Sequence, residues 1–235
     1  MFAIFKREMR SYFTSPIGYV FIAVFLGASG FMFSLSTLQA AASSDVASYF
    51  TMLLFAFIIV IPLLTMKMFS EERRSRTEQL LMTSPVSLIG MVAGKFLAAY
   101  TMFAGTYLVS CLNFYTLYKF GTPNGAQLVG YSIAILLIGG AFVAIGIFIS
   151  ALTENQIIAA IGTIAVIMLF LAAGFLNKYI DFYPLRALLD WVSIYSRFGS
   201  FTFGIFDFNA VLYYFSIVGV FIFLTVRVYE KRRWE

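Results

Sequence analysis

The sequence predicts an all-α integral membrane protein with six transmembrane helices, and three observations carry this prediction. Of the 235 residues, 61% are hydrophobic and 11% are charged, whereas soluble domains have about 25% charged residues. Six apolar segments are long enough to cross a bilayer, which takes about 20 residues in a helix. None of these six segments contains Asp, Glu, Lys or Arg. No strand-length stretch alternates polar and apolar residues, so we do not expect a β-barrel.

The composition also excludes several kinds of functional site. The chain has no His and a single Cys, so we expect no metal site, no disulfide and no His-based acid–base chemistry. The net charge of +5 would indicate a nucleic-acid partner in a soluble protein. In a membrane protein, basic loops beside anionic lipid headgroups explain it better, so we expect no nucleic-acid partner.

Residues 2–14 are predicted to form a helix that lies in the membrane interface. Phe2, Phe5, Met9 and Phe13 follow helical spacing, and basic residues occupy much of the remaining surface. A Ser-Pro pair marks the end of this helix and the start of the first span. A frayed cationic tail is one alternative. A cleaved signal peptide is another, but the apolar run that follows is longer than the about 7–15 residues of such peptides.

The predicted spans are residues 17–38, 46–66, 96–118, 128–152, 157–176 and 208–226. With six spans, both termini lie on the same side of the membrane as the loops 67–95 and 153–156. Twelve of the 16 Lys and Arg residues fall on that side, and four on the other. Because Lys and Arg are enriched in cytoplasmic loops, both termini are predicted to be cytoplasmic.

The loop of residues 67–95 contains a dense run of charged residues. Ser70 is suited to cap a helix whose first turn carries Glu71 and Glu72, the favourable charge at that end. The run continues to residue 82 and predicts a helix of about three turns, which is marginal on its own in water. We therefore expect residues 70–82 to dock onto a partner, and a solvated charged surface is the alternative.

Small residues predict close helix packing in two places. Gly90, Gly94 and Ala98 have four-residue spacing, and pairs of small residues in the fourth span have the same spacing. The stretch 90–96 resembles a phosphate loop, but it lacks one residue between the glycines and has Phe where Ser or Thr is needed. No ATP site is predicted in this chain.

Two further loops are informative. In the tight turn 153–156, Thr153 and Gln156 have capping-box spacing, and Glu154 is a secondary candidate for coupling to a partner. Segment 177–207 is too long for a simple turn and rich in apolar residues. Short helices that dip into the outer leaflet would satisfy its backbone. They would serve as an interfacial anchor or as a lid over an exit path.

The lack of charge in the spans bears on the energy source. Secondary transporters generally need ionisable groups at membrane depth, and ion channels need rings of charge or a carbonyl filter. If this protein moves a cargo uphill, the energy therefore enters from outside the chain, and residues 70–82 are the candidate receptor for it. The weakly polar spans suit a hydrophobic or amphiphilic cargo.

Four segments together resemble the type-2 ABC transporter permeases, particularly the gliding-motility-associated branch. The most specific is Glu-Glu-Arg-Arg-Ser-Arg-Thr-Glu-Gln-Leu-Leu-Met-Thr-Ser-Pro-Val-Ser, residues 71–87. The others are residues 7–20, 150–160 and 227–234. The resemblance covers essentially the whole chain.

The resemblance implies a permease in the bacterial inner membrane that pairs with a second copy. A separate cytoplasmic subunit would bind ATP and Mg and hydrolyse the ATP, so no cofactor and no enzymatic activity are expected in this chain. A further membrane protein with an extracytoplasmic domain often accompanies this branch. Residues 1–15 would form an elbow helix, residues 71–82 the coupling helix, and residues 178–205 re-entrant helices near an exit gate.

Individual residues acquire roles through the same resemblance. Contacts with the ATPase subunit would come from six charged residues and two apolar anchors, namely Glu71, Glu72, Arg73, Arg74, Arg76, Glu78, Leu80 and Leu81. The candidate gate residues are Arg186, Asp190, Trp191 and Arg197.

The sequence thus predicts the permease subunit of an ABC exporter-like complex, which moves a cargo or transmits force across the membrane. A non-transporting scaffold that anchors partner proteins is the alternative. An intramembrane enzyme is disfavoured, because the spans lack the paired carboxylates, Ser–His pair or metal ligands that such chemistry needs.

Overall fold

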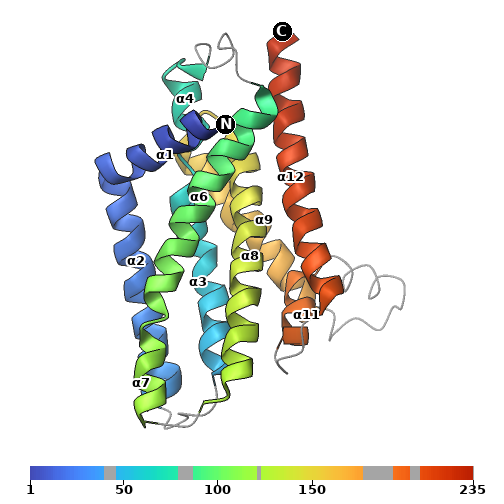
Figure 1. Ribbon diagram of the computed structural model, residues 1–235. Helices are drawn as coiled ribbons and strands as arrows, with labels where there is room; N and C mark the ends of the chain where they lie inside the picture. Colours follow the sequence, from blue (N-terminus) through green and yellow to red (C-terminus); the bar gives the residue numbers. More distant parts are fainter. Residues whose placement is uncertain (40–45, 79–86, 121–122, 177–192, 202–206, 235) are drawn as a thin grey trace.

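The computed structural model describes residues 1–39, 46–78, 87–120, 123–176, 193–201 and 207–234, and every regular element in these residues is helical. Within the described residues, six helices are long and apolar enough to cross a membrane. The predicted all-α membrane fold with six spans is therefore confirmed. Both termini lie at the same end of the bundle, which we call the terminal end (Figure 1).

The described residues form one short N-terminal helix and six long helices, with several short helical segments between the long ones. In order they are α1 (Phe2–Thr14), α2 (Pro16–Phe33), the π-helical turn η1 (Ser34–Gln39), α3 (Ala47–Thr65), α4 (Ser70–Arg74), α6 (Leu88–Ser110), α7 (Asn113–Phe120), α8 (Gly125–Leu152), α9 (Gln156–Leu176), α11 (Ile194–Phe198), the 3-10 turn η3 (Gly199–Phe201) and α12 (Phe208–Trp234).

The first helix, α1, lies across the terminal end of the bundle and packs against α2 and α6 (Figure 1). The helix predicted over residues 2–14 is confirmed in its bounds. Its end is fixed by Ser15, whose hydroxyl accepts the N–H of Ile17, and by Pro16 at the start of α2. A Cβ on Gly18 would lie 2.2 Å from the backbone oxygen of Tyr12, so this corner requires glycine.

Small residues on α6 let α1 approach closely. A Cβ added to Gly94 would lie 3.0 Å from the Met1 carbonyl oxygen and 3.3 Å from the Ile4 side chain. The predicted close-packing surface on Gly90 and Gly94 therefore exists, and its partner is the N-terminal helix.

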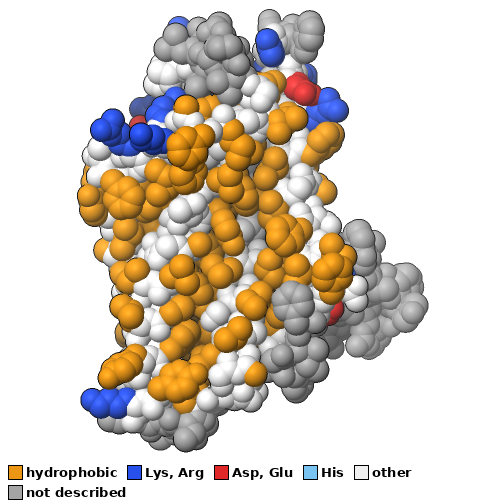
Figure 2. All heavy atoms as spheres, viewed as in Figure 1, with side chains coloured by type: hydrophobic (Ala, Val, Ile, Leu, Met, Phe, Trp, Pro, Cys, Tyr) orange, Lys and Arg blue, Asp and Glu red, His pale blue; other side chains and the backbone are white. Residues whose placement is uncertain are grey.

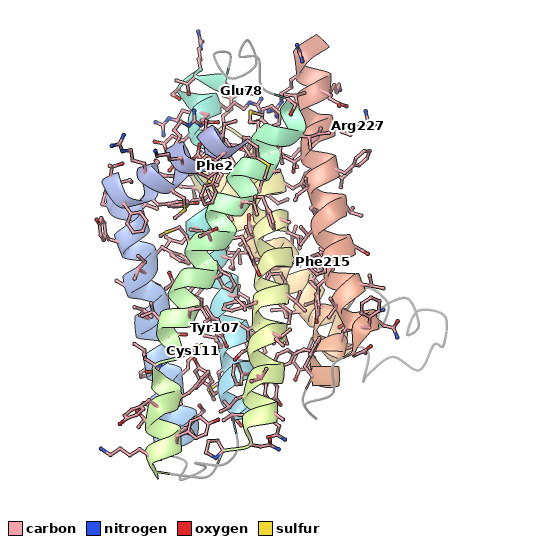
Figure 3. All side chains as sticks on the ribbon, viewed as in Figure 1. Phe2, Glu78, Tyr107, Cys111, Phe215 and Arg227 are labelled. Atoms are coloured by element: carbon pink, nitrogen blue, oxygen red, sulfur yellow. The ribbon has the colours of Figure 1, made fainter. Side chains whose placement is uncertain are left out.

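Helix α8 is the centre of the bundle and packs against α3, α6, α9 and α12. Beside it, an aromatic cluster joins three helices: the ring centroid of Phe103 lies 5.9 Å from that of Phe25 and 5.3 Å from that of Phe57. Buried polar groups in the core are satisfied internally. The Tyr107 hydroxyl, labelled in Figure 3, donates to Ser132 at 2.9 Å.

The outer surface matches a lipid environment. In the view of Figure 2, apolar side chains cover the middle of the molecule, and charged side chains gather toward its two ends. Large exposed side chains include Ile59, Leu108, Leu169 and Phe215. An apolar surface of this extent marks contact with a membrane or another protein.

Two helices extend beyond the spans predicted for them. The third span begins at Leu88 rather than at residue 96, because the hydroxyl of Ser87 caps the helix by accepting the N–H of Gly90. Lys95 therefore lies inside α6 and not in a loop. The last helix continues beyond residue 226 to Trp234. The predicted spans end beside Lys95 and Arg227, whereas the helices themselves run on past these charges.

The predicted continuous helix over residues 70–82 is wrong. Helix α4 ends at Arg74, the chain turns through Arg76 with a left-handed φ of 58°, and helical structure resumes at Glu78. The hydroxyls of Ser75 and Thr77 donate to carbonyl groups at the end of α4, which favours termination there. Ser70 does not cap this helix, because its hydroxyl donates to the Met66 carbonyl. Residues 79–82 lie outside the described chain.

Candidate functional site

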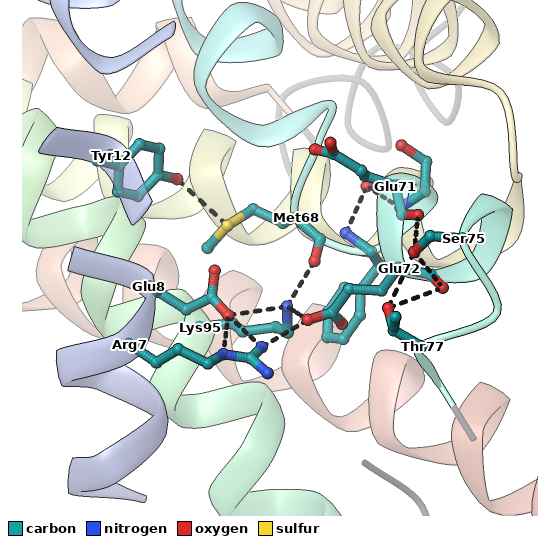
Figure 4. A network of polar contacts seen from close by, with 12 residues as sticks. Arg7, Glu8, Tyr12, Met68, Glu71, Glu72, Ser75, Thr77 and Lys95 are labelled. Atoms are coloured by element: carbon teal, nitrogen blue, oxygen red, sulfur yellow. Dashed lines mark hydrogen bonds and ion pairs between the residues drawn. The ribbon is translucent and has the colours of Figure 1, made fainter. Parts of the chain in front are cut away.

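The most unusual side chain at the terminal end is Lys95, which is 1% exposed although it carries a charge. Its ammonium lies 2.9 Å from the Glu72 carboxylate and 3.3 Å from that of Glu8, and it donates to the Met68 carbonyl at 2.6 Å. Glu8 comes from α1, Glu72 from α4 and Lys95 from α6 (Figure 4). One buried cation thus joins three elements that are distant in sequence.

Arg7 completes the group. Its guanidinium contacts the carboxylates of both Glu8 and Glu72, so two cations face two anions. We call Arg7, Glu8, Glu72 and Lys95 the Lys95 cluster. A buried charge is costly unless it is paired and hydrogen-bonded, and here each charge has at least two partners. The arrangement holds α1, α4 and α6 in one register.

The surroundings of Arg7 and Tyr12 on α1 raise the pKa of both groups. Burial lowers the pKa of Arg7, but the carboxylates of Glu8 and Glu72 together raise it more, so the pKa lies above its usual value. Burial, and then the charge of Glu8, raise the pKa of Tyr12 above its usual value. The neutral Tyr12 hydroxyl donates to the Leu64 carbonyl and lies 3.2 Å from the Met68 sulfur.

A cleft of about 340 Å³ opens beside the Lys95 cluster. Ser11 and Tyr12 of α1 line one side of it, and Lys67, Glu71 and Thr77 line the other. The cleft separates Ser11 and Tyr12 of α1 from residues 71–77. Beside the cleft, the Lys95 cluster links α1 directly to these residues.

The segment that follows α3, residues 66–78, which we call the connector, is also attached to α8. The hydroxyl of Ser150 accepts the backbone N–H groups of Phe69 and Ser70 at 3.1 and 3.2 Å, and it donates to the Met66 carbonyl at 3.1 Å. Ser150 is fully buried. A single hydroxyl therefore satisfies three backbone groups where α3 gives way to the connector.

A third attachment reaches the turn between α8 and α9. Arg73 forms an ion pair with Glu154 at 2.8 Å and donates to the Leu152 carbonyl at 3.1 Å. The structure thus brings Glu154, the predicted secondary coupling residue, directly onto a residue of the connector. In this turn Asn155, rather than Thr153, caps α9 by accepting the N–H of Ile157.

A fourth attachment reaches α12. Arg232 lies 3.4 Å from the Glu78 carboxylate and donates to the Ala151 carbonyl at 2.7 Å. The rings of Phe69 and Tyr229 also meet, with centroids 4.9 Å apart. The connector is therefore tied to α1, α6, α8, α12 and the α8–α9 turn.

The predicted coupling residues divide into two groups. Glu72, Arg73 and Glu78 form ion pairs with other parts of the same chain. Arg74 and Arg76 are exposed, and Glu71 pairs with Lys67 at 3.3 Å. Leu80 and Leu81 lie outside the described residues.

Sequence reasoning missed Arg7, Glu8, Lys95 and Arg232 as members of this site. Of the predicted gate residues, Arg186, Asp190 and Trp191 lie outside the described residues. Arg197 lies in α11, and its guanidinium stacks on the ring of Tyr213 at 4.1 Å.

Comparison with known proteins identifies the family. A family model described as ABC-2 family transporter protein matches residues 2–231. The chain belongs to this family. A search of curated proteins found no match.

Membership of the ABC-2 family makes the chain a permease component of an ABC transporter and a multi-pass membrane protein. The predicted resemblance to ABC permeases is therefore confirmed at the level of the family. The assignment to the gliding-motility-associated branch stays a prediction. In this ABC-2 permease, the match includes the connector and the elements that it contacts, apart from the last three residues of α12, which include Arg232.

Proposed function

We propose that this permease transmits motion from a separate cytoplasmic ATPase subunit to its membrane helices through the connector. The complex would resemble an ABC exporter, with two permease copies in a bacterial inner membrane, and would move a hydrophobic or amphiphilic cargo or transmit force. The observation that carries this proposal is the attachment of residues 66–78 to four helices at one end of the bundle.

The distribution of charge supports a cytoplasmic terminal end. The exposed basic residues Lys6, Arg10, Arg74, Arg76 and Arg233 lie on elements at that end. Because Lys and Arg favour the cytoplasmic side of a membrane, the connector would face the compartment that contains ATP.

The two groups of charged side chains on the connector support a division of roles. Arg74 and Arg76 are exposed, which leaves them available to an acidic groove on the ATPase subunit. Glu72, Arg73 and Glu78 are held by the permease itself. A displacement of the outer group would therefore pull on the inner group, and through it on α1, α6, α12 and the α8–α9 turn.

Lys95 lies at the terminal end of α6 rather than at membrane depth. Lys95 lies in the first two turns of α6, beside the connector, and both of its carboxylate partners belong to the terminal end. The remainder of the span, from Phe96 to Tyr118, contains no ionisable Asp, Glu, Lys or Arg. A chain without charge at membrane depth is poorly suited to ion-coupled transport, which favours an external source of energy.

Replacing both Arg74 and Arg76 with Ala tests the docking surface. We expect the affinity for the ATP-binding subunit that copurifies with the tagged permease to fall about tenfold or more, because two charge-assisted contacts are lost. Affinity is measured by titration of the two purified proteins. Lys6→Ala with Arg10→Ala is the matched control, since it removes two exposed charges from α1. Equal affinity for the test variant and the wild type would contradict the proposal.

Exchanging the charges of Arg73 and Glu154 tests transmission separately from docking. We expect Arg73→Glu or Glu154→Arg alone to reduce the stimulation of ATP hydrolysis in reconstituted complexes, and the double exchange to restore much of it. The pair is partly exposed and contributes at most about 1 kcal/mol to stability, so thermal unfolding should hardly change. A scaffold without a coupling role predicts the same ATPase rate in all three variants.

A further inference from the structure

A groove runs along α12 on the surface that it shares with α9 and α11. Its volume is about 650 Å³. The side chains that line it are Phe170 from α9, Arg197 from α11, and Asn209, Leu212, Tyr213, Ser216, Ile217, Val220 and Phe221 from α12.

The groove changes from polar to apolar along its length. Arg197, Asn209 and Tyr213 lie at one end, whereas Ile217, Val220 and Phe221 occupy the part of α12 that follows. From Asn209 to Phe221, α12 rises by about 18 Å. The groove therefore has the length and the polarity gradient of one extended hydrocarbon chain with a polar head.

The polar end lies near the membrane surface opposite the terminal end. From Asn209 to Arg227, α12 rises by about 27 Å, close to the about 30 Å thickness of a bilayer core. Arg227 is the first charged residue of α12 and lies toward the terminal end (Figure 3). Arg197 and Asn209 are consequently at the level of the lipid headgroups of the other leaflet.

The geometry of Arg197 suits an oxyanion. The central carbon of the guanidinium lies over the Tyr213 ring, 4.1 Å from the ring centroid. The N–H donors lie in the plane of the group and match the geometry of a phosphate. Asp207, which directly precedes α12, is not among the described residues that line the groove; its carboxylate accepts the N–H of Asn209.

We infer that this groove binds a phospholipid with a net negative headgroup, with one acyl chain along α12 and the phosphate at Arg197. Arg197, the single cation among the described residues that line the groove, supplies the complementary charge. The apolar side chains of α9 and α12 supply contact for the acyl chain. This inference does not depend on the ATPase partner or on transport.

Native mass spectrometry of the full chain in detergent tests this site. Phosphatidylglycerol, which is anionic, and phosphatidylcholine, which is zwitterionic, are added separately at equal concentration. We expect the wild type to retain phosphatidylglycerol preferentially. We expect Arg197→Gln to lower its occupancy about tenfold, the effect of one lost charge-assisted contact, and to lower that of phosphatidylcholine less, because the choline group already compensates its phosphate. Arg197→Lys, which keeps the charge, should retain part of the preference.

Two further variants separate the groove from the general lipid-facing surface. Ser216→Trp fills the groove and should lower retention of both lipids. Phe215→Trp is the matched control, because Phe215 is 61% exposed on the same helix and does not line the groove. The inference is overturned if the wild type shows no preference for phosphatidylglycerol, if Arg197→Gln keeps that preference, or if Phe215→Trp acts like Ser216→Trp.

Discussion

Lys95→Met is expected to lower the free energy of unfolding by up to about 3 kcal/mol, the lower end of the range for breaking a buried ion pair. The substitution leaves the carboxylates of Glu8 and Glu72 without their shared cation. The loss stays at the lower end because Arg7 still contacts both of them. Thermal unfolding in detergent measures the effect, and ATPase stimulation in the reconstituted complex should fall with it.

Two companion variants show whether charge pairing is the cause. Lys95→Met combined with Glu72→Gln removes one cation and one anion, so it should unfold at a higher temperature than Lys95→Met alone. Lys67→Met breaks an exposed pair with Glu71 and should cost at most about 1 kcal/mol. If the double variant were the least stable of the three, the shared cation would not be what holds α1, α4 and α6 together.

Much of this fold follows from local sequence. A span is recognised from about 20 consecutive apolar residues, so six candidate spans were predicted and are found. The N-terminal helix was predicted from helical spacing and from the Ser15-Pro16 boundary, and both are local as well. The close-packing surface on Gly90 and Gly94 was predicted from spacing, but the spacing does not indicate which element lies on it. In the structure that element is α1.

The site was less predictable, because its contacts join residues far apart in the chain. Lys95 and Glu8 are separated by 87 positions, and Arg232 and Glu78 by 154. The expectation that a span contains no charge places Lys95 in a loop. In the structure, the carboxylates of Glu8 and Glu72 allow Lys95 to be buried within α6.

The conformation of the connector was also not predictable from its residue types. The charged run after Ser70 was interpreted as one continuous helix that presents its charges to a partner. A left-handed Arg76 breaks it, and arginine is not a residue that indicates such a turn. The break separates the charged residues into those that face the chain and those that face away, a distinction that the residue types alone do not contain.

Gly139→Ala is expected to lower the stability of the bundle strongly for so small a change. A Cβ on Gly139 would lie 2.1 Å from the nearest ring carbon of Phe103. That ring is fully buried between Phe25 and Phe57, so it has no space to withdraw into. Overpacking of this kind costs about 1–3 kcal/mol, which thermal unfolding in detergent will detect.

Gly105→Ala is the matched control, because a Cβ on Gly105 would have no neighbour within 4 Å. It should be neutral or stabilising by up to about 1 kcal/mol, since Ala favours a helix over Gly. Phe103→Leu should partly rescue Gly139→Ala if the contact between α6 and α8 is the cause. Equal unfolding temperatures for the two alanine variants would mean that α6 and α8 are not closely packed here. Because α6 also carries Lys95, a shift of α6 away from α8 should weaken ATPase stimulation as well as stability, and it should do so without changing a residue of the connector.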